Sequence, residues 1–306
     1  MAPSSVVEAA RAALGPVGVY LPIALGANAP IDEQRTAARR LERAGYRAVW
    51  TNESVGGKDA LVQLSVLLAA TERMVFGTGI ANIWSRPAQT AQAAAAQLAQ
   101  AYPDRLVLGL GVGYPQQAAA VDREFGRPLA TMRGYLEKMA APTVPPAADA
   151  VFPRILAANG PKMLALAAEL TDGALPFGLP ASATARMRQA LGPDKLLVVG
   201  VSAFVEEPGA EPARERARAA VGAALSRPWL AEAVKQSGFT DRQIADVDDA
   251  LVDAFAAHGT PEAIAAGLRA HLAAGADHVG PVLDAGPDLL RNVETLERLA
   301  PAVLAI

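Results

Sequence analysis

Three glycines occupy alternate positions in RLVLGLGVGYPQQ, residues 105–117: Gly109, Gly111 and Gly113. Such a cluster could cradle the phosphates of a dinucleotide, but that motif requires G-x-G-x-x-G and a helix that opens directly after it. Here Tyr114 and Pro115 follow the glycines, and the sequence predicts a loop. The dinucleotide motif is therefore excluded. Glycines within a strand also indicate close approach of a backbone or a ligand, and the residues alone leave both open.

Polar and aromatic residues recur at the carboxyl ends of several predicted strands. They are Tyr20, Asn52, Glu53, Asn82, Trp84, Arg86, Asn159 (which Gly160 follows) and Phe177. In a barrel of parallel strands these ends face the active site, so we expect the side chains to gather on one rim. Each alone is compatible with an ordinary loop residue, and only their recurrence is informative.

The composition excludes several classes of site. The chain of 306 residues contains no cysteine, which excludes disulfides, thiolate metal sites and a cysteine nucleophile. The three histidines are not spaced as a zinc motif, so we expect no metal. A net charge of −3 gives no electrostatic reason to expect nucleic acid. We also find no apolar run of membrane-spanning length and no signal peptide, and we expect a cytoplasmic protein.

Eight apolar runs of strand length alternate with helical patterns. They cover residues 17–23, 48–53, 74–83, 105–113, 154–159, 172–177, 196–205 and 278–283. Runs that are apolar almost throughout are typical of parallel strands buried on both faces. Eight strand–helix units predict an α/β fold, a (β/α)8 TIM barrel, with a doubly wound open sheet as the alternative.

One segment is too long for a simple crossover between strands. Residues 206–259 contain two helical stretches, and we expect them to form a helical insertion between strands 7 and 8. We therefore expect residues 1–306 to form a single barrel domain. The pattern restarts at Thr260, a predicted N-cap that Pro261 follows.

Four segments lie in order along almost the whole chain: YPDRLVLGLGVGYP, ATERMVFGTGIANIWSRP, AANGPKMLALAAELTDGALPF and GTPEAIAAGLRAHLAAGADHV. In these segments the chain resembles the bacterial-luciferase-like oxidoreductases, in particular the branch that uses the deazaflavin coenzyme F420. The resemblance implies a TIM barrel with the coenzyme at the carboxyl ends of the strands.

The resemblance also implies which residues hold the coenzyme. Gly79 and Ile80 would form a non-prolyl cis peptide behind the ring, near Asn82. The phosphate arm would lie against Val112, Gly113, Tyr114, Ala158, Asn159 and Gly160. The sequence Gly160-Pro161-Lys162 opens a predicted helix, whose free N–H groups suit an anion.

Two residues are candidates for proton transfer. Glu53 would donate or accept a proton, since burial beside an apolar ring favours the neutral carboxyl group, while Asn52 would bind a polar group of the coenzyme. Alternatively, Glu53 caps its loop or pairs with a basic neighbour. Relatives often carry a Ser-His pair where this chain has Gly113-Tyr114. Tyr114 could replace the histidine, although a phenol is a weaker acid than an imidazolium.

The resemblance implies an F420-dependent oxidoreductase that transfers hydride between the deazaflavin and a small organic substrate, whose identity the sequence does not reveal. Two alternatives stay open: an FMN-dependent luciferase-like monooxygenase, and a non-catalytic deazaflavin-binding barrel. The alanine-rich segment 88–101 could offer a flat surface to a second copy, so we expect a homodimer.

Overall fold

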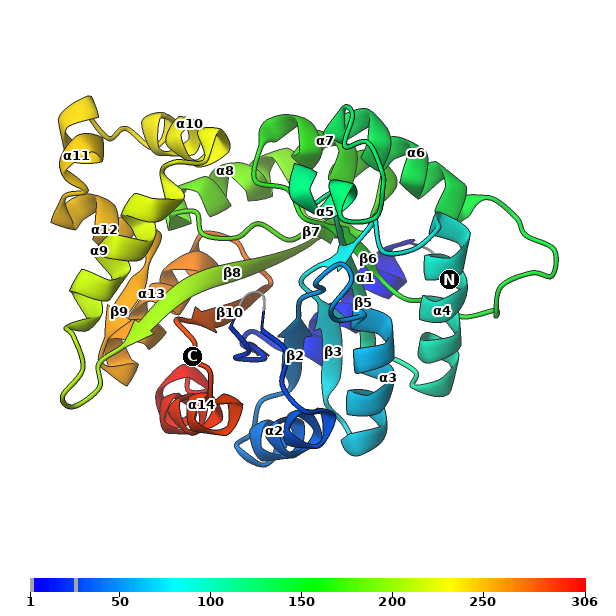
Figure 1. The fold of residues 1–306 in the computed structure, drawn as a ribbon, viewed down its shortest axis with the longest axis horizontal. Helices are drawn as coiled ribbons and strands as arrows, with labels where there is room; N and C mark the ends of the chain where they lie inside the picture. Colours follow the sequence, from blue (N-terminus) through cyan, green and yellow to red (C-terminus); the bar gives the residue numbers. More distant parts are fainter. Residues whose placement is uncertain (1–2, 25–26) are drawn as a thin grey trace.

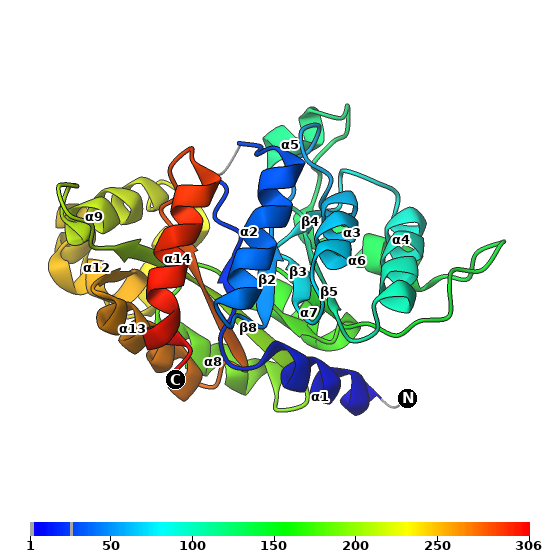
Figure 2. The same cartoon turned by 90° about the horizontal axis from the view of Figure 1, so that it is seen from below.

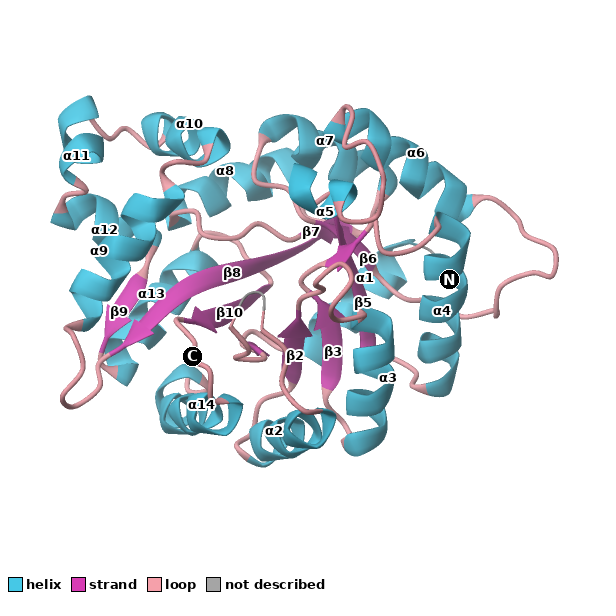
Figure 3. Ribbon diagram, viewed as in Figure 1, coloured by secondary structure: helices cyan, strands magenta, loops and turns pink. Residues whose placement is uncertain are grey.

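The computed structural model describes residues 3–24 and 27–306, and its central element is a ring of eight parallel strands (Figures 1 and 3). In spatial order these are β1 (Val19–Tyr20), β2 (Ala48–Thr51), β3 (Val75–Thr78), β5 (Leu106–Gly111), β6 (Arg154–Leu156), β7 (Gly173–Ala174), β8 (Leu196–Val205) and β10 (His278–Leu283). Two short strands extend it: β4 (Ala81–Asn82) pairs with β5, and β9 (Ala257–Gly259) pairs with β8.

Hydrogen bonds between the first and last strands close the ring. The N–H of Gly18 donates to the carbonyl of Val279 at 3.0 Å, and the N–H of Val279 donates to the carbonyl of Pro16 at 2.9 Å. Val17 and Val279 form a parallel bridge at this point. The predicted barrel is thus confirmed, and the open sheet is excluded.

Helices surround the strands, as the alternating pattern predicts. They are α2 (Ile31–Arg43), α3 (Ala60–Ala70), α4 (Ala88–Ala101), α6 (Pro128–Ala140), α7 (Pro161–Leu170), α8 (Ala181–Leu191), α13 (Pro261–Ala273) and α14 (Leu289–Val303). After β5, where the sequence predicts a loop, the structure instead has the short helix α5 (Pro115–Ala119), which begins at Pro115. The predicted N-cap of α13 is present, since the hydroxyl of Thr260 accepts the N–H of Ala263.

The predicted helical insertion between the seventh and eighth barrel strands is also present. It consists of α9 (Ala213–Ala224), α10 (Pro228–Gln236), α11 (Asp241–Asp246) and α12 (Asp249–Phe255), followed by β9. Figure 1 shows these helices gathered on one side of the barrel.

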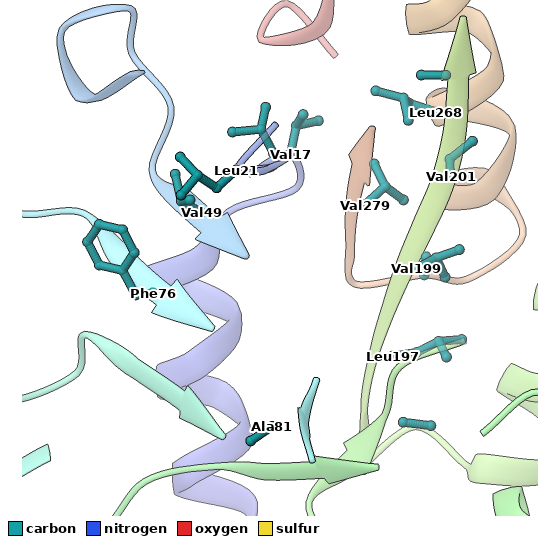
Figure 4. Packing of buried hydrophobic residues seen from close by; sticks show 14 of the residues in the cluster. Val17, Leu21, Val49, Phe76, Ala81, Leu197, Val199, Val201, Leu268 and Val279 are labelled. Carbon is teal, nitrogen blue, oxygen red and sulfur yellow. The ribbon is translucent and has the colours of Figure 1, made fainter. Parts of the chain in front are cut away.

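The strands are buried on both faces, and alternate residues of β8 show this clearly. Leu197 and Val199 belong to the outer layer, between the strands and helices such as α13, whose Leu268 lies nearby in Figure 4. Leu196 and Val198 belong to a second cluster, to which six strand segments contribute and which fills the barrel. This double burial is why the strand runs are apolar almost throughout.

Helix α1 (Pro3–Leu14) lies across the amino-terminal end of the barrel (Figure 2). Its Val7, Ala10 and Leu14 join the inner cluster. Arg11 fixes its position through a hydrogen bond of 2.9 Å from Nε to the carboxylate of Asp277. A ligand that enters the barrel therefore has to approach from the carboxyl-terminal rim.

Candidate functional site

The rim contains the cis peptide that the resemblance predicts, between Gly79 and Ile80. This segment is tied to the adjacent end of β2, because the N–H of Gly79 donates to Thr51 at 2.6 Å and the N–H of Glu53 donates to Ile80 at 3.1 Å. Glycine is required here, since a Cβ at Gly79 would lie only 2.7 Å from Cε1 of Tyr20.

The carboxylate of Glu53 is fully buried and makes several contacts. It accepts the backbone N–H of Ala60 at 3.0 Å and that of Asn82 at 2.5 Å, and it forms an ion pair with Arg86. Arg86 pairs in turn with Asp59 at 2.6 Å. The carboxylate therefore joins the end of β2, the start of α3 and the segment after the cis peptide, in agreement with the alternative in which Glu53 pairs with a basic neighbour.

Asp59 reinforces this junction as the N-cap of α3. Its carboxylate accepts the N–H groups of Leu61 and Val62 at 2.9 and 3.0 Å. Although burial alone would raise the pKa of Asp59, hydrogen bonds from Val62 and Arg86 outweigh burial and lower it. Arg86 thus contacts two carboxylates that both serve to hold the rim.

A second network holds the loop after β5. The side-chain oxygen of Gln117 accepts Nδ2 of Asn82 at 3.1 Å and the backbone N–H of Tyr114 at 2.9 Å. Gly113 has φ +58°, and a Cβ there would lie 2.0 Å from the same oxygen. The sequence analysis missed Gln117, because nothing in a polar loop indicates which amide will turn inwards.

The remaining predicted residues of this loop have other partners. The carbonyl of Val112 accepts Nε1 of Trp84 at 2.8 Å. Tyr114 is 45% exposed, and the guanidinium of Arg227 lies 5.9 Å from the centre of its ring. Tyr114 therefore extends towards the start of α10 in the insertion, whereas Glu53 is buried in the barrel rim.

The predicted residues after β6 form the third part of the rim. Ala158 is buried. The amide of Asn159 binds the backbone of Phe177 twice, accepting its N–H at 3.0 Å and donating to its carbonyl at 3.2 Å. Gly160 precedes α7, and a Cβ there would meet nothing within 4 Å. The first turn of α7 thus offers backbone N–H groups next to open space.

Lys58 is a further residue of the rim that the sequence analysis missed. Its side chain is buried, with 9% of the residue exposed, and its Nζ donates to Oδ1 of Asn52 at 2.7 Å. Burial lowers the pKa of Lys58 to about 8, and the charge of Glu53 opposes this only in part. A lysine in a glycine-containing loop is ordinarily exposed, so the sequence did not indicate that Lys58 would be buried at the rim.

Aromatic rings fill the barrel below the rim. The ring of Tyr20 lies 6.3 Å from that of Trp50, which lies 5.7 Å from that of His278. Nε1 of Trp50 donates to Nε2 of His278 at 3.0 Å, and Nδ1 of His278 lies 2.7 Å from the carbonyl of Gly15. These contacts fix His278 as the neutral tautomer with its proton on Nδ1.

Of these three rings, that of Tyr20 lies next to Gly79 of the rim. A Cβ at Gly200 would lie 3.1 Å from its hydroxyl oxygen and 2.8 Å from Phe177. The hydroxyl is buried and has no hydrogen-bond partner in residues 3–24 and 27–306. Burial raises its pKa.

None of the three histidines supplies an imidazole at the rim. His258 contacts Asp253 at 2.7 Å beside α12, His271 contacts Thr184 at 2.8 Å between α13 and α8, and His278 lies within the barrel. Among the described residues, no group of three or more His, Asp or Glu side chains could hold a metal ion. No helix of this part of the chain is long and apolar enough to cross a bilayer.

These features correspond to one known family. The family model described as luciferase-like monooxygenase matches residues 16–278. The chain belongs to the luciferase-like family. The match covers seven barrel strands in full and ends at His278, the first residue of β10, and it includes the rim described above.

Two curated relatives and one solved structure illustrate the similarity. The 5,10-methylenetetrahydromethanopterin reductase of Methanolobus tindarius is 31% identical over 157 residues, which are 45% of this chain and 48% of the relative. A Mycobacterium tuberculosis protein, provisionally named a coenzyme F420-dependent oxidoreductase, is 31% identical over 186 residues, 50% of this chain and 52% of the relative. The chain thus spans about half the length of the curated relatives it matches.

The solved structure is a coenzyme F420-dependent tetrahydromethanopterin reductase from Methanopyrus kandleri. It superposes with a TM-score of 0.71 at 17% identity, covering 92% of this chain and 97% of that chain. At this identity the similarity concerns the fold, which is that of a luciferase-like barrel.

Proposed function

We propose that this luciferase-like protein is a coenzyme F420-dependent oxidoreductase, which transfers hydride between the deazaflavin and a small organic substrate. The observation that carries the proposal is the match of residues 16–278 to the luciferase-like family, a match that includes the rim residues described above. The choice of coenzyme is supported by the 31% identity to the Mycobacterium tuberculosis relative, whose name describes an F420-dependent oxidoreductase.

The rim offers groups that fit such a coenzyme. The backbone of Gly79 and Ile80 is half-buried at the rim, and we expect a flat ring to pack against it, next to Asn52 and Asn82. The start of α7 offers N–H groups to a phosphate, so the arm would lie near Val112, Gly113, Tyr114, Ala158, Asn159 and Gly160. When bound, the coenzyme would supply the hydride, and the protein would supply orientation and a proton.

The contacts of Glu53 and Tyr114 bear on their predicted roles in proton transfer. Glu53 already binds two backbone N–H groups and Arg86, an arrangement that favours a role in holding the rim. Tyr114 is exposed, so its hydroxyl would reach a substrate that approaches from the side of the insertion. Proton transfer by either residue stays a prediction.

The second candidate function is an FMN-dependent monooxygenase, which the description of the matching family favours. Titration of the purified protein with oxidised F420 and with FMN separates the two. We expect quenching of deazaflavin fluorescence with a stoichiometry near one per chain and no saturable binding of FMN. Saturable binding of FMN alone would replace the proposal with the second candidate. Deazaflavin binding without turnover of any substrate would favour a non-catalytic barrel.

A homodimer and a cytoplasmic location also stay predictions. In α4, Ala91, Ala95 and Ala99 are buried within the chain, and their helix packs against α6. The alanines therefore form part of the core, and a dimer would have to use the exposed glutamine side chains of the opposite face. A monomeric mass by light scattering at micromolar concentration would contradict the dimer.

A further inference from the structure

Lys58 carries a buried ammonium group that donates a hydrogen bond to an uncharged amide. Nζ donates to Oδ1 of Asn52 at 2.7 Å, and no carboxylate lies within 4 Å of it among the described residues. An ammonium has three N–H donors, so two have no acceptor in this part of the chain. A buried charge without a counter-ion is unfavourable, and such groups are typical of sites that bind a ligand.

The neighbouring carboxylates are already engaged. Glu53 binds Arg86 and two backbone N–H groups. Asp59, which follows Lys58 in the chain, also binds Arg86 and caps α3. The segment before α2 contributes the uncharged Asn28, which donates to the carbonyl of Gly57 at 3.4 Å. The nearby carboxylates thus form their ion pairs with Arg86, and the charge of Glu53 offsets the burial of the Lys58 ammonium only in part.

Lys58 also lies next to the proposed coenzyme site. Its partner Asn52 follows β2 directly, and the next residue, Glu53, donates its backbone N–H to Ile80 of the cis peptide. Burial lowers the pKa of Lys58 to about 8, so the group is mostly protonated at neutral pH but gives up its proton readily. This is the property that a proton donor requires at a rim that lacks an imidazole.

We propose that Lys58 is the proton donor of this site and that its substrates are aldehydes or ketones. This inference rests on the proposed function. When bound, the reduced deazaflavin would supply hydride to the carbonyl carbon, and the π electrons of the C=O bond would move to oxygen. That oxygen would take a proton from Nζ of Lys58, which would become a neutral amine and regain a proton from water. The products would be an alcohol and the oxidised deazaflavin.

The test compares Lys58→Met, Lys58→Arg and the control Lys138→Met with the wild-type protein. Lys138 is an exposed lysine of α6. Without ligand, Lys58→Met should raise the midpoint of thermal unfolding, because it removes an unpaired buried charge, and Lys138→Met should not change it. Binding of oxidised F420 should stay within about threefold of wild type in Lys138→Met.

Turnover is measured as oxidation of reduced F420 by a panel of aldehydes and ketones. In the wild type, kcat/KM should be constant below about pH 8 and fall above it. Lys58→Met should lower kcat by about 100-fold, the usual contribution of a general acid. Lys58→Arg should abolish the fall above pH 8, since arginine stays protonated there.

Three outcomes would overturn the inference while leaving the proposed function intact. These are full activity of Lys58→Met, a lower unfolding midpoint of Lys58→Met than of wild type, and deazaflavin binding by a wild-type protein that reduces no carbonyl compound in the panel. A wild-type protein that binds no deazaflavin would overturn the proposed function itself.

Discussion

The carboxylate of Glu53 accepts the backbone N–H of Asn82 at 2.5 Å, and this bond joins the end of one barrel strand to the segment that follows the cis peptide of the next. Arg86 neutralises the same carboxylate. The geometry of the rim thus depends on a buried ion pair, which leads to the first prediction.

Replacing Glu53 with glutamine should destabilise the protein substantially. The substitution leaves the buried Arg86 with Asp59 as its remaining carboxylate, and loss of one partner of a buried pair costs about 3 kcal/mol. Chemical denaturation measures the change in the free energy of unfolding. Glu169→Gln is the matched control, since it breaks an exposed pair with Arg133 and should leave the unfolding midpoint unchanged. Equal effects of the two substitutions would contradict the structural role of Glu53.

Replacing Gly113 with alanine should weaken coenzyme binding and stability together. Its φ of +58° is unfavourable for alanine, and the new Cβ would lie 2.0 Å from the oxygen of Gln117 that holds Asn82 and Tyr114. The strained backbone alone costs about 1 kcal/mol. We expect deazaflavin binding at least about tenfold weaker, equivalent to 1.4 kcal/mol.

Gly134→Ala is the control for this glycine. Gly134 lies within α6 with open space around its Cα, so alanine should stabilise the helix by about 0.5–1 kcal/mol without changing deazaflavin affinity. A Gly113→Ala protein as stable as wild type, with unchanged affinity, would show that the loop after β5 is not held as described.

Two buried tyrosines should respond differently to loss of the hydroxyl group. The hydroxyl of Tyr46 donates to Leu296 at 2.7 Å, so Tyr46→Phe should cost about 1 kcal/mol. The hydroxyl of Tyr20 has no partner among the described residues, so Tyr20→Phe should leave the ligand-free protein as stable as wild type or more stable. Urea denaturation of both variants checks this difference. A loss of stability in Tyr20→Phe equal to that in Tyr46→Phe would contradict it.

Two buried histidines should make the protein less stable in mild acid. Burial lowers the pKa of both His271 and His278 from 6.5 to about 4. Above pH 6.5 both are neutral in the folded and unfolded states. Between pH 6.5 and 4 the unfolded chain binds protons that the folded chain does not, so stability falls, by about 3 kcal/mol for each histidine over the whole window. Below about pH 4 both histidines are protonated in the folded and the unfolded states, so they lower the stability no further.

The measurement is the free energy of unfolding between pH 7 and 5, a range chosen because it lies above the ordinary pKa of carboxyl groups. His271→Gln should remove about half of the pH dependence contributed by the two histidines. Stability that does not change between pH 7 and 5 in the wild type would contradict the burial of both rings as neutral groups.

The barrel was predictable from the sequence because its strands are buried on both faces, which leaves long apolar runs. The position of the cis peptide at Gly79 was predictable only from the resemblance. The roles of Gln117 and Lys58 were not predictable, since both depend on how polar loops fold back onto the rim. The alanines of α4 were expected to form an exposed flat surface, but most of them are buried, because small side chains also allow close packing within a chain.

The role of α1 was also missed. Its sequence pattern does not distinguish a surface helix from one that closes the end of a barrel, and the contacts of Leu14 with the inner cluster decide between them. The contacts of Asn159 with the backbone of Phe177 were not predictable either, and its role in coenzyme binding stays a prediction.

The measurement that tests the account most directly is a crystal structure of the protein with reduced coenzyme F420. We expect the deazaflavin ring to lie against Gly79 and Ile80, with its phosphate at the start of α7 near Gly160. A coenzyme bound away from the cis peptide, or crystals soaked at saturating concentration with no coenzyme at the carboxyl rim, would contradict the central claim.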